Sequence, residues 1–292
     1  HIKVFVPTEE FTKVFTTAFN QVLFIKPEHV WANAKGFKKI AGKFSDKLAY
    51  RVNRKSANRE NAYNPFASDV EDTSLVSINT AFQNTIYFNR LGTVFGIDFS
   101  YEQNQNKTLL TNGFESRDFQ SYGVRTRWNI TRKFTITFGG KLGDKLNRSE
   151  FFSTNNYNIL FEELEPKLSY QPGISFRSSI YYRRRIQENA PEFGMERATN
   201  QAIGTEIRYS LPNRGNLQAN FELTEILFEG DANTPIGYEM LNGLQPGTNL
   251  TWTALYQRNI GNHMQLSLSY SGRNSEGVRT LHNGSAQVRA FF

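Results

Sequence analysis

The chain has 292 residues, contains no cysteine, is 14% aromatic and carries a formal net charge of +7. Its mean hydropathy is −0.54, and no run approaches the roughly 18 consecutive apolar residues of a spanning helix, so that class is excluded. Without cysteine, disulfides and thiolate metal sites are excluded too. The basic residues are scattered rather than clustered, which argues against nucleic-acid binding.

The first 43 residues give the weakest strand pattern. Ile2, Val4 and Val6 alternate with other residues as the tail of a strand would, and residues 15–25 alternate over a full strand length. Residues 36–43 have apolar side chains at helical spacing and predict a short amphipathic helix. We expect residues 1–43 to supply N-terminal strands and a helical connection to the same structure as residues 44–292.

From residue 44 onward, apolar side chains recur at every second position. Such runs begin at Phe44, Ile78, Phe95, Tyr122, Phe134, Leu164, Ile174, Ile203, Leu217, Leu250, Met264 and His282. Each is about 9–14 residues long, the length at which a tilted strand crosses a bilayer. The pattern predicts an all-β fold, a transmembrane antiparallel up-and-down β-barrel of about 14 strands, with more strands if the chain is a fragment.

The connections between these runs alternate between short and long. Short turns lie near Leu91, Thr131, Pro172, Asn213 and Gly261, and the long polar loops are 53–73, 104–118, 143–156, 184–200, 229–248 and 271–280. Outer-membrane barrels have short periplasmic turns and longer outer loops. We therefore expect a bacterial outer-membrane location, with the C-terminus on the periplasmic side.

The last strand ends in an aromatic residue. Val288, Ala290 and Phe292 share one face, and a terminal Phe is typical of the strand that the barrel-assembly machinery recognises. Ala290 stands where a second aromatic is usual, and Gln287 where a glycine is usual, so the signal departs from its common form.

The outward-facing set ends in aromatic residues that are candidates for girdles at the membrane interfaces, where they would contact lipid and lipopolysaccharide. An ordinary aromatic core is the alternative. Candidates at the outer ends are Tyr101, Tyr122, Tyr182, Tyr256 and Tyr270, and those at the periplasmic ends are Trp128, Tyr170 and Tyr209.

The opposite, lumen-facing set is polar and charged. It comprises Asp98, Glu102, Arg125, Arg127, Lys141, Glu162, Arg177, Arg183, Glu206, Arg208, Glu222 and Arg289. Charges in such a place must be paired or wetted, so they form either a structural ion-pair lattice or an anion-attracting conduit. Neighbouring strands should bring Arg208 near Glu222, and Asp98 near Arg125.

Catalysis and metal binding find little support. The four histidines are His1, His29, His263 and His282, and they do not form a catalytic grouping with a nucleophile and an acid. We expect no enzyme activity and no cofactor, although His282 with a loop carboxylate leaves one alternative open.

Two loop features have bland and functional interpretations. Asp69, Glu71 and Asp72 could hold calcium or be merely solvated, and we expect no metal site. Residues 183–185, three consecutive arginines, are expected at the outer rim, facing lipopolysaccharide phosphates or solvent.

The part of the chain from about residue 75 onward resembles the C-terminal barrel portion of large, mostly uncharacterised outer-membrane proteins of Bacteroidota. The stretches that carry this resemblance are KTLLTNGFESR (107–117), EPKLSYQPGISFR (165–177), GYEMLNGLQPGTNLTW (237–252) and the segment from 268 to 292. The resemblance implies location and barrel architecture, and it implies no catalytic residues. Relatives in that phylum include TonB-dependent transporters and the type 9 secretion translocon.

These observations lead to two functional hypotheses. The first is a channel or transport-type barrel within a larger outer-membrane assembly. The second is a non-conducting scaffold whose long loops (58–72 and 229–249) bind a partner protein, a surface lipoprotein or a surface polymer. A soluble β-sandwich is a third alternative, but it does not explain the alternation of loop lengths.

Overall fold

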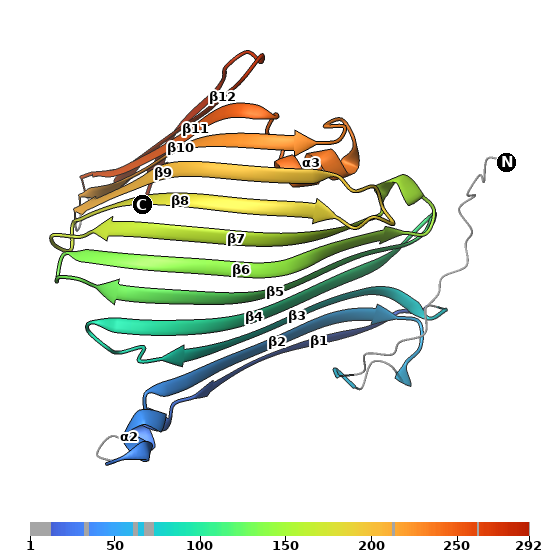
Figure 1. Cartoon of the computed structure of the whole chain (residues 1–292), viewed down its shortest axis with the longest axis horizontal. Coiled ribbons are helices and arrows are strands. Elements are labelled where there is room, and N and C mark those ends of the chain that lie inside the picture. Colours follow the sequence, from blue (N-terminus) through green and yellow to red (C-terminus); the bar gives the residue numbers. More distant parts are fainter. Residues whose placement is uncertain are drawn as a thin grey trace.

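The computed structural model describes residues 13–31, 35–60, 64–66, 73–211, 214–261 and 263–291. Within them lies a single antiparallel sheet of thirteen strands, in which each strand pairs with the next in the chain (Figure 1). The strands are β1 (Phe15–Ile25), β2 (Phe44–Ser56), β3 (Leu75–Phe88), β4 (Phe95–Leu110), β5 (Gly113–Asn129), β6 (Phe134–Ser149), β7 (Tyr157–Tyr170), β8 (Phe176–Asn189), β9 (Arg197–Leu211), β10 (Gly215–Glu229), β11 (Gly247–Ile260), β12 (Met264–Ser275) and β13 (Leu281–Ala290). The expected all-β, up-and-down, antiparallel architecture is confirmed.

Four short helices lie beside this sheet in the described ranges. They are α1 (Pro27–Val30), α2 (Phe37–Ala41), the 3₁₀ turn η2 (Ser153–Asn155) and α3 (Pro235–Leu241). The helix expected within residues 36–43 is confirmed as α2. No helix in the described ranges has both the length and the apolar character needed to span a bilayer. The expected strand at Ile2, Val4 and Val6 lies outside the described residues.

Several strands run further than their apolar pattern, so the strict alternation of loop lengths was wrong. The expected long loop at 104–118 is a two-residue turn between β4 and β5, closed by Gly113 at φ 109°. The expected loop at 271–280 shrinks to residues 276–280. The reason is that a backbone ladder needs no apolar side chains: polar residues such as Gln103 and Gln105 continue the pairing where their side chains meet water.

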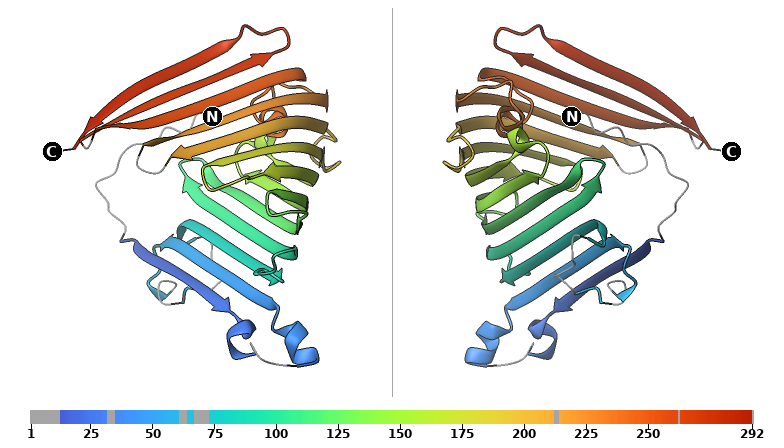
Figure 2. Two further views of the ribbon diagram at one scale, coloured as in Figure 1. Left: turned by 90° about the vertical axis from the view of Figure 1, so that its left-hand side faces the viewer. Right: turned by 90° about the vertical axis from the view of Figure 1, so that its right-hand side faces the viewer.

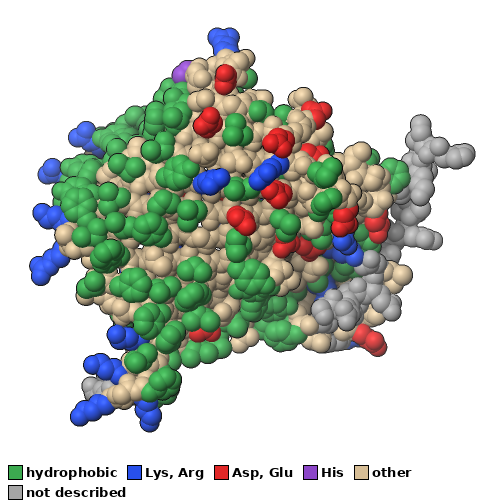
Figure 3. Space-filling view, viewed as in Figure 1, with side chains coloured by type: hydrophobic (Ala, Val, Ile, Leu, Met, Phe, Trp, Pro, Cys, Tyr) green, Lys and Arg blue, Asp and Glu red, His purple; other side chains and the backbone are tan. Residues whose placement is uncertain are grey.

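The two faces of the sheet follow from the strand register, because directly opposite residues point to the same face. One face carries Phe99 opposite Val124, Trp128 opposite Ile136, and Leu223 opposite Leu250. This face is convex, and exposed apolar side chains cover much of it (Figures 2 and 3). The other, concave face is predominantly polar and holds α3.

Three glycines lie beneath aromatic rings of the neighbouring strand. Phe161 is directly opposite Gly143, Tyr181 opposite Gly204, and Trp252 opposite Gly272. A Cβ at any of these glycines would come within 3 Å of the ring. Such pairs fix strand register, because the ring covers backbone that a side chain would otherwise occupy.

Near the long-loop end, part of the β2–β3 connection folds back on the convex face. Arg54 donates to the Asn64 carbonyl (2.8 Å), and Tyr50 donates to the Pro65 carbonyl (3.0 Å). The Phe66 ring stacks on Tyr50, with centroids 5.4 Å apart. This segment therefore covers the sheet instead of extending freely.

The curved sheet is open between β1 and β13, which do not pair (Figure 2). An odd number of strands in an antiparallel meander makes these two edges run in the same direction. About 14 strands were expected, and thirteen are present in the described part. An all-antiparallel closure of this wall requires an odd number of additional strands, since one strand must oppose both edges.

Candidate functional site: the concave face and its inserted helix

The concave face carries far more basic than acidic side chains. By register, its basic strand residues are Lys47, Arg51, Lys55, Arg117, Arg125, Arg127, Lys141, Lys145, Lys167, Arg177, Arg183, Arg185, Arg208, Arg273 and Arg289, and its acidic ones are Asp98, Glu102, Glu115, Glu163, Glu165, Glu206 and Glu222. These are fifteen basic residues against seven acidic ones. The strand residues of the convex face are nearly balanced. The positive charge of the chain is therefore concentrated on one side of the sheet.

A charged cluster on β7, β8 and β10 forms the centre of this face. Arg183 donates through Nε to Glu165 at 2.8 Å, and its Nη1 lies 3.4 Å from Glu222. The Tyr181 hydroxyl also donates to Glu222, and the Arg183 guanidinium lies 5.1 Å from the Tyr181 ring. All these groups are half-buried or buried. Each charge in the cluster has an opposite charge and a hydrogen bond, which together offset the cost of its burial.

Most remaining acids of this face are also neutralised. Further ion pairs join Lys167 to Glu206 (2.9 Å), Arg185 to Glu163 (3.7 Å), Arg125 to Asp98 (2.7 Å) and Arg117 to Glu115 (2.8 Å). The seventh acid, Glu102, accepts a hydrogen bond from Asn104 at 2.9 Å. Six of the seven acids are thus spent on ion pairs, and the excess positive charge is left on the surface.

Arg177 and Arg208 show this excess most clearly, because they lie directly opposite each other on β8 and β9. Like charges in such a pair repel, and neither arginine forms an ion pair within the described part of the chain. The expected contact of Arg208 with Glu222 is wrong: register places Gln218 opposite Arg208, four residues from Glu222. The expected contact between Asp98 and Arg125 is present.

Helix α3 lies against the concave face near the long-loop end. It begins where the Thr234 hydroxyl accepts from the Gly237 N–H (3.1 Å), and it ends at Asn242 in the left-handed conformation. Met240 and Ile236 pack on Ile159 and Ala198 of the wall. Sequence analysis treated the whole 229–248 stretch as an outer loop, and this inward docking was not expected.

Polar contacts also hold α3 in place. Buried Gln187 donates to the Met240 carbonyl at 2.8 Å, and Arg273 donates to the Gly243 carbonyl at 2.8 Å. Lys145 forms an ion pair with Glu239. Contacts therefore reach α3 from β6, β8 and β12, three widely separated parts of the wall.

A polar cavity of about 400 Å³ remains between this helix and the wall. Its lining includes Arg183, Arg185 and Glu222 from the strands and Leu241 and Asn242 from the helix end. The helix thus narrows the concave space beside the charged cluster without filling it.

The structure places the predicted lumen-facing residues on the concave face, with one exception. Glu162 is directly opposite Leu142 and lies on the convex face, so its expected inward orientation was wrong. Sequence analysis missed Glu163, Glu165 and Lys167, the neighbours that do face inward. The two-residue alternation of β7 contained that information, since Leu164 and Leu168 share the face of Glu162.

The predicted girdle residues all lie on the convex face, but not at the expected heights. Tyr101, Tyr122, Tyr182 and Tyr270 are near the middle of their strands, six or seven residues from the short-turn end. Tyr256 is only four residues from the short-turn end of β11, so its expected position at the outer end was wrong. Trp128, Tyr170 and Tyr209 lie at the short-turn ends, as expected.

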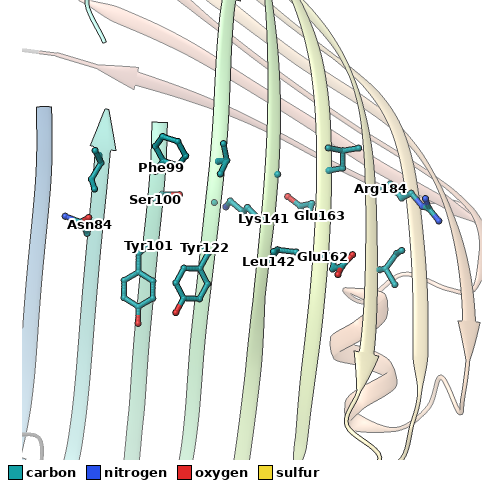
Figure 4. Close-up of a pocket in the computed structure, with 16 residues that line it drawn as sticks. Asn84, Phe99, Ser100, Tyr101, Tyr122, Lys141, Leu142, Glu162, Glu163 and Arg184 are labelled. Atoms are coloured by element: carbon teal, nitrogen blue, oxygen red, sulfur yellow. The ribbon is translucent and has the colours of Figure 1, made fainter. Parts of the chain in front are cut away.

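An apolar groove of about 660 Å³ lies on this convex face (Figure 4). Phe99, Tyr101, Tyr122 and Leu142 line it, and the two tyrosine rings are 5.0 Å apart. Glu162 and Arg184 of the convex face line its other side, and Ser100, Lys141 and Glu163 of the concave rows also border it. Along this groove, the side chains of the convex face change from apolar to charged.

The remaining predicted features have varied placements. Val288 and Ala290 lie on the convex face of β13, and Phe292 is outside the described residues, as are Asp69, Glu71 and Asp72. His282 is on the convex face too, where its Nδ1 is 2.8 Å from the Tyr270 hydroxyl. Residues 183–185 lie in the middle of β8 rather than at the rim, with Arg184 alone facing outward. No cluster of three metal-binding side chains occurs among the residues described.

Comparisons with solved structures give a likeness, whereas comparisons of sequence give none. No protein-family model matches the chain, and no curated protein sequence matches it. Among solved structures, the chain is similar to the β domain of the Bordetella autotransporter Brka, with a TM-score of 0.32 and 9% identity over 96% of this chain and 97% of that chain. A likeness this low assigns neither a family nor a function to the chain.

Proposed function

We propose that the chain forms the wall of a transmembrane β-barrel in the bacterial outer membrane, and that its concave face lines a conduit that prefers anions. The observation that carries this proposal is the contrast between the two faces: exposed apolar side chains on one, and an unbalanced excess of basic residues on the other. The proposal includes no catalytic step. Lipid, lipopolysaccharide and the barrel-assembly machinery are the partners that it implies.

The height of the apolar band supports a bilayer location. On β6, the convex face is apolar from Phe134 to Leu142, with Gly140 between, and becomes charged at Asp144. Eight residues at about 3.3 Å each, tilted by about 40°, span roughly 20 Å. This approaches the apolar band of about 25 Å on known outer-membrane barrels. Trp128 and Tyr170 mark its short-turn border.

The charge imbalance supports anion preference over a purely structural lattice. A lattice requires pairing, and pairing consumes six of the seven concave acids with only five of the fifteen bases, while a sixth base, Lys145, pairs with Glu239 of α3. The basic residues that have no carboxylate partner can stay charged on this face only if water and mobile anions surround them. A focused positive potential would concentrate anions in such a space.

Closure of the barrel is part of this proposal. Open strand edges do not persist in hydrocarbon, because their backbone groups would have no partners there. We infer that further strands, odd in number, complete the wall between β1 and β13. A conduit exists only in that completed form.

The scaffold alternative draws support from α3. A helix held inside by contacts from three strands narrows the lumen, and a sufficiently narrow lumen would not conduct. The same inward docking argues against residues 229–249 as a free binding loop, because the side chains of Met240 and Leu241 are buried between this loop and the wall.

The decisive measurement is ionic current through the purified protein in a planar bilayer under a KCl gradient. An anion-preferring conduit will give a reversal potential displaced toward that of chloride. A cation-selective current would refute the conduit proposed here. A sealed bilayer with inserted, folded protein would favour the scaffold, and stoichiometric companions co-purified from native membranes would then identify its partners.

A further inference from the structure

Charged residues outside the strands divide sharply between the two ends of the sheet. Connections at the short-turn end carry Lys26, Lys35, Lys38, Lys39, Lys43, Arg90, Arg132, Lys133 and Arg214, against one acidic residue in the described ranges there, Glu28 of α1. Connections at the other end carry Glu60, Glu150, Glu192, Glu196, Asp231, Glu239 and Glu276 against only Arg59 and Arg279 in the described part. Figure 3 shows this division as blue groups on the left and red groups on the right.

Residues 35–43, around α2, combine the strongest part of that basic end with exposed apolar side chains. Phe37 is 82% exposed and Ile40 is 55% exposed. Four lysines, at positions 35, 38, 39 and 43, surround them. No side chain of α2 is buried, so the fold of the sheet does not explain why these two residues are apolar.

The position of α2 is continuous with the apolar band. Phe44 begins β2 on the convex face and pairs with Phe88, with ring centroids 4.9 Å apart. From there α2 projects beyond the end of the sheet (Figure 1). If the convex face lies in lipid, α2 is located at the depth of the headgroups.

We propose that residues 35–43 form an interfacial anchor that binds anionic phospholipids in the leaflet at the short-turn end. A short amphipathic segment binds a membrane in two ways. Its apolar side chains insert among the acyl chains, and its flanking lysines attract the headgroup phosphates. Charge complementarity selects anionic lipid over a neutral surface, because basic residues outnumber acidic ones nine to one in the described connections of this end. This inference rests on the proposed membrane location of the convex face.

The test exploits the absence of cysteine from the chain. A single Ile40→Cys carries an environment-sensitive fluorophore, and the protein is placed in nanodiscs of zwitterionic lipid with or without phosphatidylglycerol. We expect a blue-shifted emission and stronger quenching by brominated acyl chains when the anionic lipid is present, and both effects should weaken in high salt. Each lysine near such a surface should change the partition constant about fivefold.

Matched variants separate charge from structure. Replacing the four lysines by Gln should abolish the response to anionic lipid, and replacing them by Arg should preserve it. Equal emission in both lipid compositions would overturn the anchor. A label shielded in native membranes but aqueous in every nanodisc would also overturn it, by indicating a protein partner.

A second label distinguishes failure of the anchor from failure of the membrane location. Leu164 is exposed on the convex face, and Leu164→Cys should be quenched by brominated lipid in either composition. If the label at 164 is quenched and the label at 40 is not, only the anchor fails. If neither is quenched, the membrane location itself is wrong.

Discussion

Truncation of Met240 should loosen α3 from the concave face. The side chain is 0% exposed and packs on Ile159, Ala198 and Ile236. Met240→Ala removes three heavy atoms and leaves part of their space empty. Such truncations cost about 2–5 kcal/mol in cores, and we place this site near 2–3 kcal/mol because a docked loop can settle into the gap.

Because the loss concerns the docking of one loop, it should appear as local opening and not as global unfolding. A change of about 2–3 kcal/mol raises the population of the undocked state roughly 30- to 150-fold. The chain has no cysteine, so Leu241→Cys, at a position only 2% exposed, provides a single reporter. Its rate of modification by a maleimide should rise by that factor in Met240→Ala.

The control lies on the same helix. Tyr238 is 71% exposed, and Tyr238→Ala should leave the modification rate unchanged. Heat-modifiable mobility on gels should be retained in all variants, showing that the barrel is intact. If Met240→Ala increases the rate no more than Tyr238→Ala does, the helix is not held by this packing, and its role in narrowing the lumen is wrong.

Three further changes test the sheet and its charges. Gly143→Ala should lower the free energy of unfolding by about 1–3 kcal/mol, because its Cβ would lie 2.2 Å from a backbone oxygen, whereas Gly140→Ala, with its nearest neighbour at 4.0 Å, should be neutral in denaturant titrations. Arg177→Glu combined with Arg208→Glu should move the reversal potential toward that of potassium, and an unchanged potential would contradict an anion conduit at that position. Glu165→Gln should lower the free energy of unfolding by about 1 kcal/mol at most, seen as a small drop in the thermal midpoint, because its half-exposed partner Arg183 keeps a second carboxylate, Glu222. A larger loss of stability would mean that the cluster acts as one unit.

The face that each residue occupies could largely be predicted from the sequence, because alternation along a strand depends only on the chain itself. The ion-pair partners of these residues could not be predicted in the same way. The contact of Asp98 with Arg125 was predicted only from their inward-facing positions on neighbouring strands, since the two-residue turn that sets their register had been expected to be a long loop. The pairing of Arg183 with both Glu165 and Glu222 joins three strands, and Glu222 lies on β10, which is not adjacent to β8.

The docking of α3 was hidden for a different reason. Its sequence is polar and turn-rich around a few apolar residues, so it has the composition of an exposed loop. The information that Met240 is buried is divided between the helix and residues on β7 and β9, which are far away in the chain. The same composition rule assigned the polar ends of strands to loops, because a ladder beyond the apolar band needs no apolar side chains.

Glu162 shows which of two rules prevails when they conflict. A charge rule places the carboxylate inward, while alternation with Leu164 places it outward, and the structure follows alternation. A one-residue slip would move every side chain of β7 to the other face, expelling Glu163 and Glu165 from their arginines and exposing Leu164 to the polar side. The cost of one outward carboxylate is small compared with that loss. Glu162 lies opposite Leu142, at the height where the apolar band ends, and it lines the groove together with outward-facing Arg184. The register of the whole strand therefore determines the position of this residue, and an outward charge in such a sequence marks the height at which the apolar band stops.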